Sequence, residues 1–320
     1  MAGQRARELR ALGRDILSLT AGEPDFETPE HIKEAAIRAM AAGQTRYTDV
    51  GGTPALKEAI AAKLRNENGL DYAPGEIIVG TGAKQVIFNA LMCTVAAGDE
   101  VIVPAPYWVS YPDIALLAGG VPVFVDCPAA HRFKLQPADL ERAITAKTRW
   151  LMLNSPNNPS GATYTRAELQ ALAEVLRRHP QVWILTDDIY EHLIYGDVEF
   201  ATMAQAAPDL KDRTLTVNGV SKAYAMTGWR IGYGAGPSEL IQAMVKLQSQ
   251  STSGPNSIAQ AAAIAALTGP QDIVAANRRE YQQRRDTVVA ALNAIEGIHC
   301  QVPDGAFYIF ASCSELFGLC

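Results

Sequence analysis

The chain alternates between two kinds of hydrophobic pattern. Short, nearly continuous apolar runs are typical of strands buried on both faces of a parallel sheet. Longer segments between them have helical periodicity, as where Leu56, Ile60 and Leu64 fall four residues apart. This alternation predicts an α/β fold with a mostly parallel central sheet flanked by helices. The expected strands are residues 77–79, 101–103, 121–125, 150–153, 182–185 and 215–217.

Helix-start signals support this reading. Thr28 and Thr53 each precede a proline, which predicts a capping hydroxyl followed by Pro in the first turn. Two further helices are expected over residues 137–144 and 165–178, and the second carries Leu169, Leu172, Val175 and Leu176 on one stripe.

Composition and charge exclude several protein classes. The 320 residues are 48% hydrophobic and 19% charged, as in an ordinary globular protein of about two domains. A net charge of −6 argues against a nucleic-acid partner. No apolar run reaches the roughly 18 residues of a membrane span, and residues 1–14 lack the apolar core of a secretory signal.

The cysteines and histidines predict neither disulfides nor a metal site. Five scattered cysteines without a Cys-x-x-Cys pair favour a reducing compartment, and therefore a cytoplasmic protein. The five histidines have no close metal-ligand spacing, so no metal is expected.

Ligands of open parallel sheets bind beyond the carboxyl ends of the strands. The first expected strand is followed by Gly80-Thr81-Gly82-Ala83-Lys84-Gln85 and then a helix, which fits either an anion-binding turn or a plain tight turn. The spacing does not match a P-loop, and Gln85 stands where a dinucleotide fingerprint needs a third glycine.

Three other strand ends carry candidate groups. Tyr107 and Trp108 either stack on a flat ring or fill the edge of the core. The asparagine-rich loop 154–161 presents amide donors. Asp187 and Asp188 point to opposite faces, so one of them can hold a protonated ring nitrogen, or else cap a helix.

The last strand end carries a lysine in unusual surroundings. Lys222 lies among small and apolar residues, where desolvation lowers the pKa of an amine and makes it a nucleophile for carbonyl carbon. Arg230 follows eight residues later, and its planar guanidinium suits a phosphate.

These clusters, in this order, resemble the class I aminotransferases of the aspartate aminotransferase superfamily, which use pyridoxal 5'-phosphate. Residues 219–232 resemble the family's pyridoxal-lysine signature. Residues 21–26, 106–111 and 154–161 are similar to the bacterial subgroup of aspartate and aspartate–prephenate aminotransferases. The similarity runs from about Arg5 to Phe310.

The resemblance implies a role for each matching residue. Lys222 would form the Schiff base with the cofactor and move protons, and Asp187 would keep the pyridine nitrogen protonated. The other implied cofactor contacts are Tyr190 and Asn158 at the phenolic oxygen, Trp108 on the ring, Gly82, Ala83, Lys84 and Arg230 at the phosphate end, and Tyr47 from a second subunit. Gly22, Lys84, Trp108 and Asn158 would contact the substrate, with Lys84 at its side-chain carboxylate.

The same resemblance predicts the activity and organisation. The expected reaction converts aspartate and 2-oxoglutarate to oxaloacetate and glutamate, with prephenate as a further acceptor, in a homodimer. Residues 37–270 would form a large cofactor-binding domain, and residues 1–36 with 271–320 a smaller α+β domain.

Both ends depart from the family pattern. The chain stops at Cys320, before the arginine that clamps the substrate's α-carboxylate in the family, and its start is short. We therefore expect an incomplete small domain with bare apolar surface. Two alternatives remain: a cofactor-binding remnant without turnover, and a nicotinamide dehydrogenase that uses the glycine-rich turns.

Overall fold

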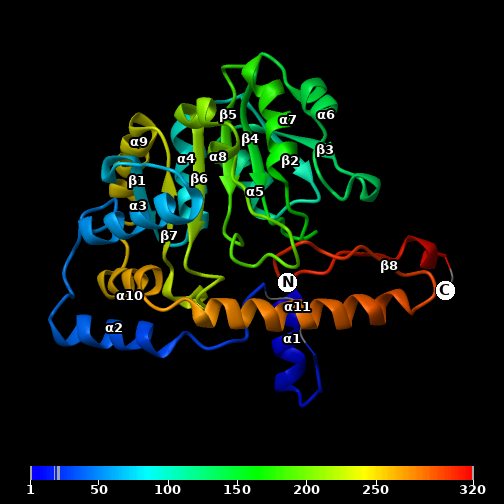
Figure 1. Cartoon of the computed structure of the whole chain (residues 1–320), viewed down its shortest axis with the longest axis horizontal. Coiled ribbons are helices and arrows are strands. Elements are labelled where there is room, and N and C mark those ends of the chain that lie inside the picture. Colours follow the sequence, from blue (N-terminus) through cyan, green and yellow to red (C-terminus); the bar gives the residue numbers. More distant parts are fainter. Residues whose placement is uncertain (1, 18, 20–21, 319–320) are drawn as a thin grey trace.

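Seven strands of the computed structural model form one mixed sheet, in the order β1-β7-β6-β5-β4-β2-β3 (Figure 1). The structure describes residues 2–17, 19 and 22–318. Two residues named in the sequence analysis lie outside this part: Ala21, the first residue of the family-like segment 21–26, and Cys320, the last residue of the chain. Six strands are mutually parallel, and only β7 runs antiparallel to its neighbours. The predicted fold class is confirmed. The strands are β1 (Ile77–Gly80), β2 (Glu100–Ala105), β3 (Val121–Asp126), β4 (Thr148–Asn154), β5 (Trp183–Asp187), β6 (Thr214–Gly219) and β7 (Gly232–Ala235).

All six predicted strands are present, and the sheet adds one that the sequence did not reveal. The missing strand is β7, whose sequence Gly-Tyr-Gly-Ala lacks an apolar run. The prediction of burial on both faces is wrong for β3, because this strand lies at the sheet edge. Val121 is 48% and Phe124 49% exposed there.

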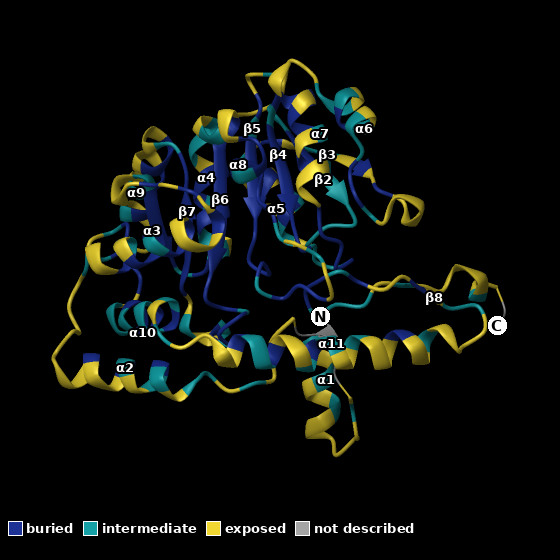
Figure 2. Cartoon of the chain, viewed as in Figure 1, coloured by how far each residue is buried: buried dark blue, intermediate teal, exposed yellow. Residues whose placement is uncertain are grey.

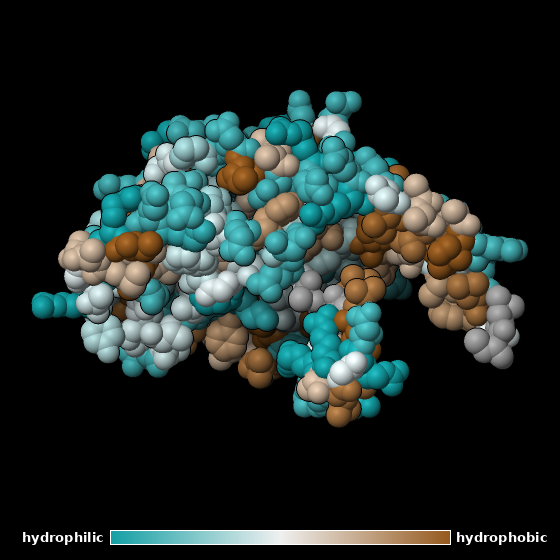
Figure 3. Space-filling model, turned by 90° about the horizontal axis from the view of Figure 1, so that it is seen from below, coloured by the Kyte–Doolittle hydropathy of each residue, from teal (hydrophilic) through white to brown (hydrophobic). Residues whose placement is uncertain are grey.

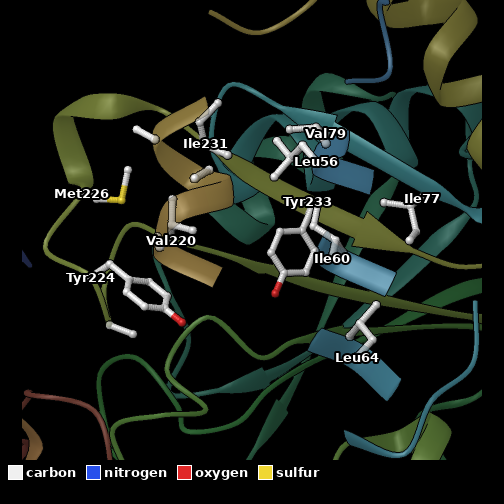
Figure 4. Packing of buried hydrophobic residues seen from close by; sticks show 14 of the residues in the cluster. Leu56, Ile60, Leu64, Ile77, Val79, Val220, Tyr224, Met226, Ile231 and Tyr233 are labelled. Atoms are coloured by element: carbon white, nitrogen blue, oxygen red, sulfur yellow. The ribbon is translucent and has the colours of Figure 1, made fainter. Parts of the chain in front are cut away.

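Helices cover both faces of the sheet. Alternate residues of the same strand pack on opposite layers, as where Ile77 and Val79 face α3 and α10 while Ile78 faces α4 and α9. Figure 4 shows the first of these clusters, with Tyr233 among Leu56, Ile60 and Leu64. The helices are α1 (Ala2–Ala11), α2 (Glu30–Ala41), α3 (Pro54–Asn68), α4 (Ala83–Thr94), α5 (Ser110–Leu117), α6 (Pro137–Ala143), α7 (Arg166–Arg177), α8 (Met203–Ala206), α9 (Ser238–Ser251), α10 (Ser257–Thr268) and α11 (Asp272–Asn293).

One of the two predicted threonine caps is correct. The Thr53 hydroxyl accepts a hydrogen bond from the Leu56 amide at the start of α3. Thr28 does not cap α2, whose N-cap residue is Pro29. The Thr28 hydroxyl instead donates to the Ala225 carbonyl at 2.6 Å, so a distant partner takes the place of the local one.

The terminal segments lie along one side of the sheet. Figure 1 shows α11 running beneath the sheet toward the short hairpin of β8 (His299–Cys300) and β9 (Ala311–Ser312). Figure 2 shows dark, buried strands above largely exposed α1, α2 and α11. None of the helices among the described residues is long and apolar enough to cross a membrane.

Apolar surface is exposed beside the C-terminal hairpin. Figure 3 shows hydrophobic surface gathered at this end of the molecule. The large apolar residues exposed along this segment are Val288, Ile295, Val302, Phe310 and Phe317.

The topology brings the candidate groups together. Because β1, β2, β4, β5 and β6 are parallel, their carboxyl ends meet at one edge of the sheet. The antiparallel β7 begins at that edge, which explains why Arg230, two residues before it, joins the same site.

The four cysteines among the described residues are free thiols.

Candidate active site

A cavity of about 590 Å³ opens at the carboxyl edge of the sheet. Most of the site residues predicted from the sequence line it, although they come from segments far apart in the chain. These residues are Gly22, Ala83, Lys84, Trp108, Asn158, Asp187, Tyr190, Lys222 and Arg230.

Lys222 presents its amine to this cavity. Its Nζ donates a hydrogen bond to the Gly22 carbonyl oxygen at 2.6 Å and lies 5.7 Å from the Phe307 ring centroid. Burial lowers the pKa of Lys222 and Arg230 lowers it further, while Asp187 and Glu23 act in the opposite direction. The net shift is downward, as the sequence predicted, and it favours a neutral, nucleophilic amine.

Asp187 provides the acidic group of the site, opposite in charge to the lysine. It is buried, and its Oδ2 accepts a hydrogen bond from the Tyr111 hydroxyl at 2.7 Å. Burial raises the pKa of Asp187 to about 6, although Tyr111, the Ile189 amide and Lys222 stabilise the ionised form. Asp188 does not line the cavity, and its carboxylate instead faces the Thr186 hydroxyl. The two aspartates therefore point apart, as expected.

A pair of phenols lies near the lysine and the aspartate. The hydroxyls of Tyr190 and Tyr308 are hydrogen-bonded at 2.6 Å. Burial, the nearby Tyr308 and Asp187 raise the pKa of Tyr190, and a hydrogen bond with Asn158 partly opposes them. Tyr190 is therefore a neutral hydrogen-bond donor at physiological pH, suited to an anionic oxygen.

The start of α4 and Arg230 together form an anion cradle. No side chain caps α4, so its first amides and the positive end of its dipole face the cavity beside the guanidinium. Arg230 is held by hydrogen bonds to the carbonyls of Thr227 at 2.8 Å and Thr81 at 3.2 Å. Two glycines allow this approach: a Cβ on Gly82 would lie 2.3 Å from Arg230 Nη2, and one on Gly232 2.1 Å from the Ala83 nitrogen.

Gly82→Ala is expected to damage this cradle. Gly82 has φ +91°, a region that costs a residue with a side chain about 1–2 kcal/mol, and the added Cβ displaces Arg230. We expect the Gly82→Ala variant to unfold at a lower midpoint temperature than the wild type. We also expect inorganic phosphate to raise that midpoint temperature less in the variant than in the wild type. Gly75→Ala is the control, because a Cβ there meets no atom within 4 Å. Phosphate stabilisation that is equal in the two variants would contradict the cradle.

Lys84 and Trp108 are in contact on one wall. Lys84 Nζ lies 4.7 Å from the Trp108 ring centroid, and Tyr111 packs edge-on against the same indole at 5.4 Å. One face of Trp108 is thus covered by a cation in this structure. A flat ring that stacks there would take the place of Lys84 or use the other face.

Of the two predicted residues absent from the lining, Gly82 still lies beside Ala83 and Arg230 in the cradle, whereas the fold does not bring Tyr47 to the cavity. Tyr47 is 96% exposed and absent from the lining, so a role for it rests on a second copy of the chain.

Sequence reasoning also missed several lining side chains. The most important are Tyr111 and Tyr308, whose partners lie 76 and 118 residues away in the chain. No local pattern marks such contacts. Glu23, Ser221 and Thr227 also line the cavity without having been assigned a role, whereas Tyr107 and the loop of Asn154 were named as candidates and do line it.

Comparison with known proteins agrees with this geometry. The family described as "Aminotransferase class I and II" matches residues 14–317. The chain is 60% identical over 314 residues to the aspartate/prephenate aminotransferase of Cereibacter sphaeroides, covering 98% of this chain and 78% of that protein. It is 59% identical over 315 residues to a probable aspartate/prephenate aminotransferase of Rhizobium leguminosarum bv. phaseoli, with coverages of 98% and 79%.

Solved structures share the fold over nearly the whole chain. The crystal structure of the aspartate aminotransferase from Rhizobium meliloti superposes with a TM-score of 0.97 at 56% identity, covering 99% of this chain and 79% of that one. The Thermus thermophilus aspartate aminotransferase with maleate gives a TM-score of 0.93 at 46% identity, with coverages of 99% and 82%.

Proposed function

Because this chain belongs to the class I and II aminotransferases, a family that depends on pyridoxal phosphate, we propose that it transfers the amino group of a dicarboxylic amino acid to a 2-oxo acid. The proposed reaction converts aspartate and 2-oxoglutarate to oxaloacetate and glutamate, with prephenate as a further acceptor. Membership of this family removes the nicotinamide dehydrogenase alternative.

One observation carries the proposal. A single cavity combines the desolvated amine of Lys222, the buried carboxylate of Asp187, and the cradle of α4 and Arg230. These three features match the aldehyde, ring nitrogen and phosphate of pyridoxal phosphate. The residues present therefore fit the cofactor chemically.

The chain's own residues divide the work between binding and proton transfer. When bound, pyridoxal phosphate supplies a carbonyl that accepts the amino group and a protonated ring that withdraws electrons from the substrate Cα. Lys222 Nζ would hold the cofactor and would then serve as the base that takes the proton from the substrate Cα. The Asp187 carboxylate would keep the ring nitrogen protonated through a charge-assisted hydrogen bond.

The remaining residues bind and orient the cofactor. Tyr190 and Asn158 would donate hydrogen bonds to the phenolic oxygen, and Trp108 would stack on the ring. Gly82, Ala83 and Arg230 would hold the phosphate, near Lys84, with Tyr47 from a second copy. Trp108 and Asn158 also contact the substrate beside the ring.

We assign substrate selection to Lys84 and Gly22. Both residues line the cavity. The backbone of Gly22 would face the substrate's α-carboxylate, and the Lys84 ammonium would face the side-chain carboxylate. The names of the relatives, and the maleate of the Thermus structure, which is itself a dicarboxylate, support this substrate class.

Lys84→Ala is expected to discriminate against dicarboxylic substrates. Loss of one charge-assisted contact lowers kcat/KM for aspartate by about 10–100-fold. The value for alanine, which has no side-chain carboxylate, changes by less than about threefold. Steady-state rates for the two amino donors check this. An equal loss for both donors would remove the assigned role.

The direct test of the proposed function is spectroscopic. Purified protein is titrated with pyridoxal phosphate, and we expect a visible absorbance band that aspartate bleaches and 2-oxoglutarate restores. A band that aspartate leaves unchanged would favour the alternative of cofactor binding without turnover. The absence of any band would refute the proposed cofactor.

The predicted organisation remains part of this proposal. We propose a large domain of residues 37–270, a smaller one of residues 1–36 with 271–320, and a cytoplasmic homodimer. The exposed Tyr47 and the free, scattered cysteines support the dimer and the compartment respectively. Sedimentation of the protein loaded with cofactor tests the dimer.

A further inference from the structure

A buried polar cluster lies directly behind Tyr190, outside the cavity. Its members are Lys63 and Asn68 on α3, Glu191 after β5, and Asn218 near the end of β6. All four are buried, with Lys63 4% and Glu191 8% exposed. None of them lines the cavity, so the reaction proposed above does not use them directly. Buried charges of this kind are rare unless each is paired and hydrogen-bonded.

The Glu191 carboxylate is the centre of this cluster. It forms an ion pair with Lys63 Nζ and accepts hydrogen bonds from Asn68 Nδ2 at 2.9 Å and Asn218 Nδ2 at 2.8 Å. Lys63 Nζ also donates to Asn68 Oδ1 at 2.8 Å. Burial alone would raise the pKa of Glu191, but the charges of Lys63 and His192 and these hydrogen bonds lower it to about 2. The carboxylate is therefore ionised throughout the working pH range.

The cluster is not a metal site. Glu67, Glu191 and His192 are close enough together to share a cation. The Lys63 ammonium already occupies that position, since it pairs with Glu191 and lies 3.5 Å from Glu67. A protein cation thus supplies the positive charge that a metal would bring.

The hydrogen bonds join the two segments that carry the site. Glu191 follows Tyr190 directly, and its amide donates to the Asp188 carbonyl at 2.9 Å, which closes the turn after β5. Asn218 accepts from the Gly219 amide at 2.7 Å, where the chain leaves β6 toward Lys222. One carboxylate thereby connects the segment of Tyr190, the segment of Lys222 and α3.

We propose that Glu191, held by Lys63, is a positioning residue that fixes the Tyr190 hydroxyl relative to Lys222, and this inference rests on the proposed function. A fixed Tyr190 donates effectively to the phenolic oxygen of the bound cofactor. A Tyr190 on a loosened turn loses that geometry, although its phenol is still present. The effect is one of orientation, because Glu191 does not touch the cavity.

The experiment measures coupling between Tyr190 and the cluster. Removing one charge alone leaves the other buried and unpaired, so the test uses the double variant Lys63→Met/Glu191→Gln, which removes both. The matched control is Lys134→Met/Glu168→Gln, because Lys134 is also a buried lysine in an ion pair, 2.5 Å from Glu168, and neither residue lines the cavity. Tyr190→Phe is then introduced into the wild type and both backgrounds.

The readout is the pH midpoint of the visible absorbance of the bound cofactor, which does not depend on turnover. In the wild type and the control, Tyr190→Phe should move the midpoint by at least about one pH unit, because a hydrogen bond to the anionic oxygen is lost. In the Lys63→Met/Glu191→Gln background the shift should fall below half that value.

Two results would overturn the inference. An undiminished shift in the Lys63→Met/Glu191→Gln background would mean that the cluster only stabilises the fold. An equal reduction in the control background would mean that any lost ion pair loosens the site. Failure of the wild type to form the band would instead refute the proposed function.

Discussion

Lys222→Ala is expected to abolish both the covalent attachment of the cofactor and turnover. The amine is the nucleophile and the proton carrier of the proposed mechanism, and alanine can perform neither step. We expect the visible band to disappear and kcat to fall by about 10⁴-fold or more. The measurements are absorbance titration with pyridoxal phosphate and single-turnover rates with aspartate.

Lys84→Ala is the matched control for this loss. Lys84 is also a cavity lysine, but its ammonium lies over Trp108 at 4.7 Å, and its side chain is exposed whereas Lys222 is half-buried. The Lys84 variant should keep the band. A band that persists in Lys222→Ala would mean that another amine carries the cofactor, and the mechanism proposed here would then be wrong.

Most strands of the sheet could be predicted from the sequence because buried parallel strands form short, nearly continuous apolar runs. Six apolar runs matched six strands, and eight of the predicted residues that line the cavity follow the ends of predicted strands, whereas Gly22 was predicted only from the family resemblance. β7 was missed for a physical reason. Gly232 and Gly234 must be small because the Ala83 backbone and the Val86 side chain approach them, so two of the four positions of this strand cannot carry the β-branched residues that reveal a strand.

Contacts over long sequence distances account for most of the other omissions. Tyr111 reaches Asp187 and Tyr308 reaches Tyr190 only after the chain has folded. The incorrect cap at Thr28 has a similar cause, because the Ala225 carbonyl that receives its hydrogen bond lies 197 residues away. Local patterns predict elements and strand ends, whereas such pairings depend on the relative placement of elements.

Asp187→Asn is expected to stabilise the cofactor-free protein while removing most of its activity. Burial raises the pKa of Asp187 from 3.8 to about 6, so folding disfavours the ionised carboxylate. For an acid with a raised folded-state pKa, stability is highest below the unfolded pKa and is lost as pH rises toward the folded pKa. The loss develops between about pH 4 and pH 6 and amounts to about 3 kcal/mol at neutral pH.

Asparagine avoids this loss because it does not ionise. The free energy of unfolding of the cofactor-free variant should therefore exceed that of the wild type by about 1–3 kcal/mol at pH 7.5, since part of the gain is offset where the amide meets the Ile189 N–H. The difference in free energy of unfolding between the variant and the wild type should shrink toward zero near pH 4, where Asp187 is protonated in both the folded and the unfolded wild type. Denaturant titrations at both pH values measure it.

The same substitution should reduce turnover by about 10³-fold, because the ring nitrogen loses its anionic partner. Asp188→Asn separates the gain in stability, which comes from removing a buried carboxylate, from the loss of turnover, which comes from removing the partner of the ring nitrogen. Asp188 is also buried, and burial raises its pKa, but its carboxylate faces Thr186 rather than the cavity. That variant should gain stability at neutral pH and keep its activity. If Asp188→Asn were the inactive variant, the assignment of the two carboxylates to opposite faces of the strand end would be reversed, and Asp187 could not be the partner of the ring.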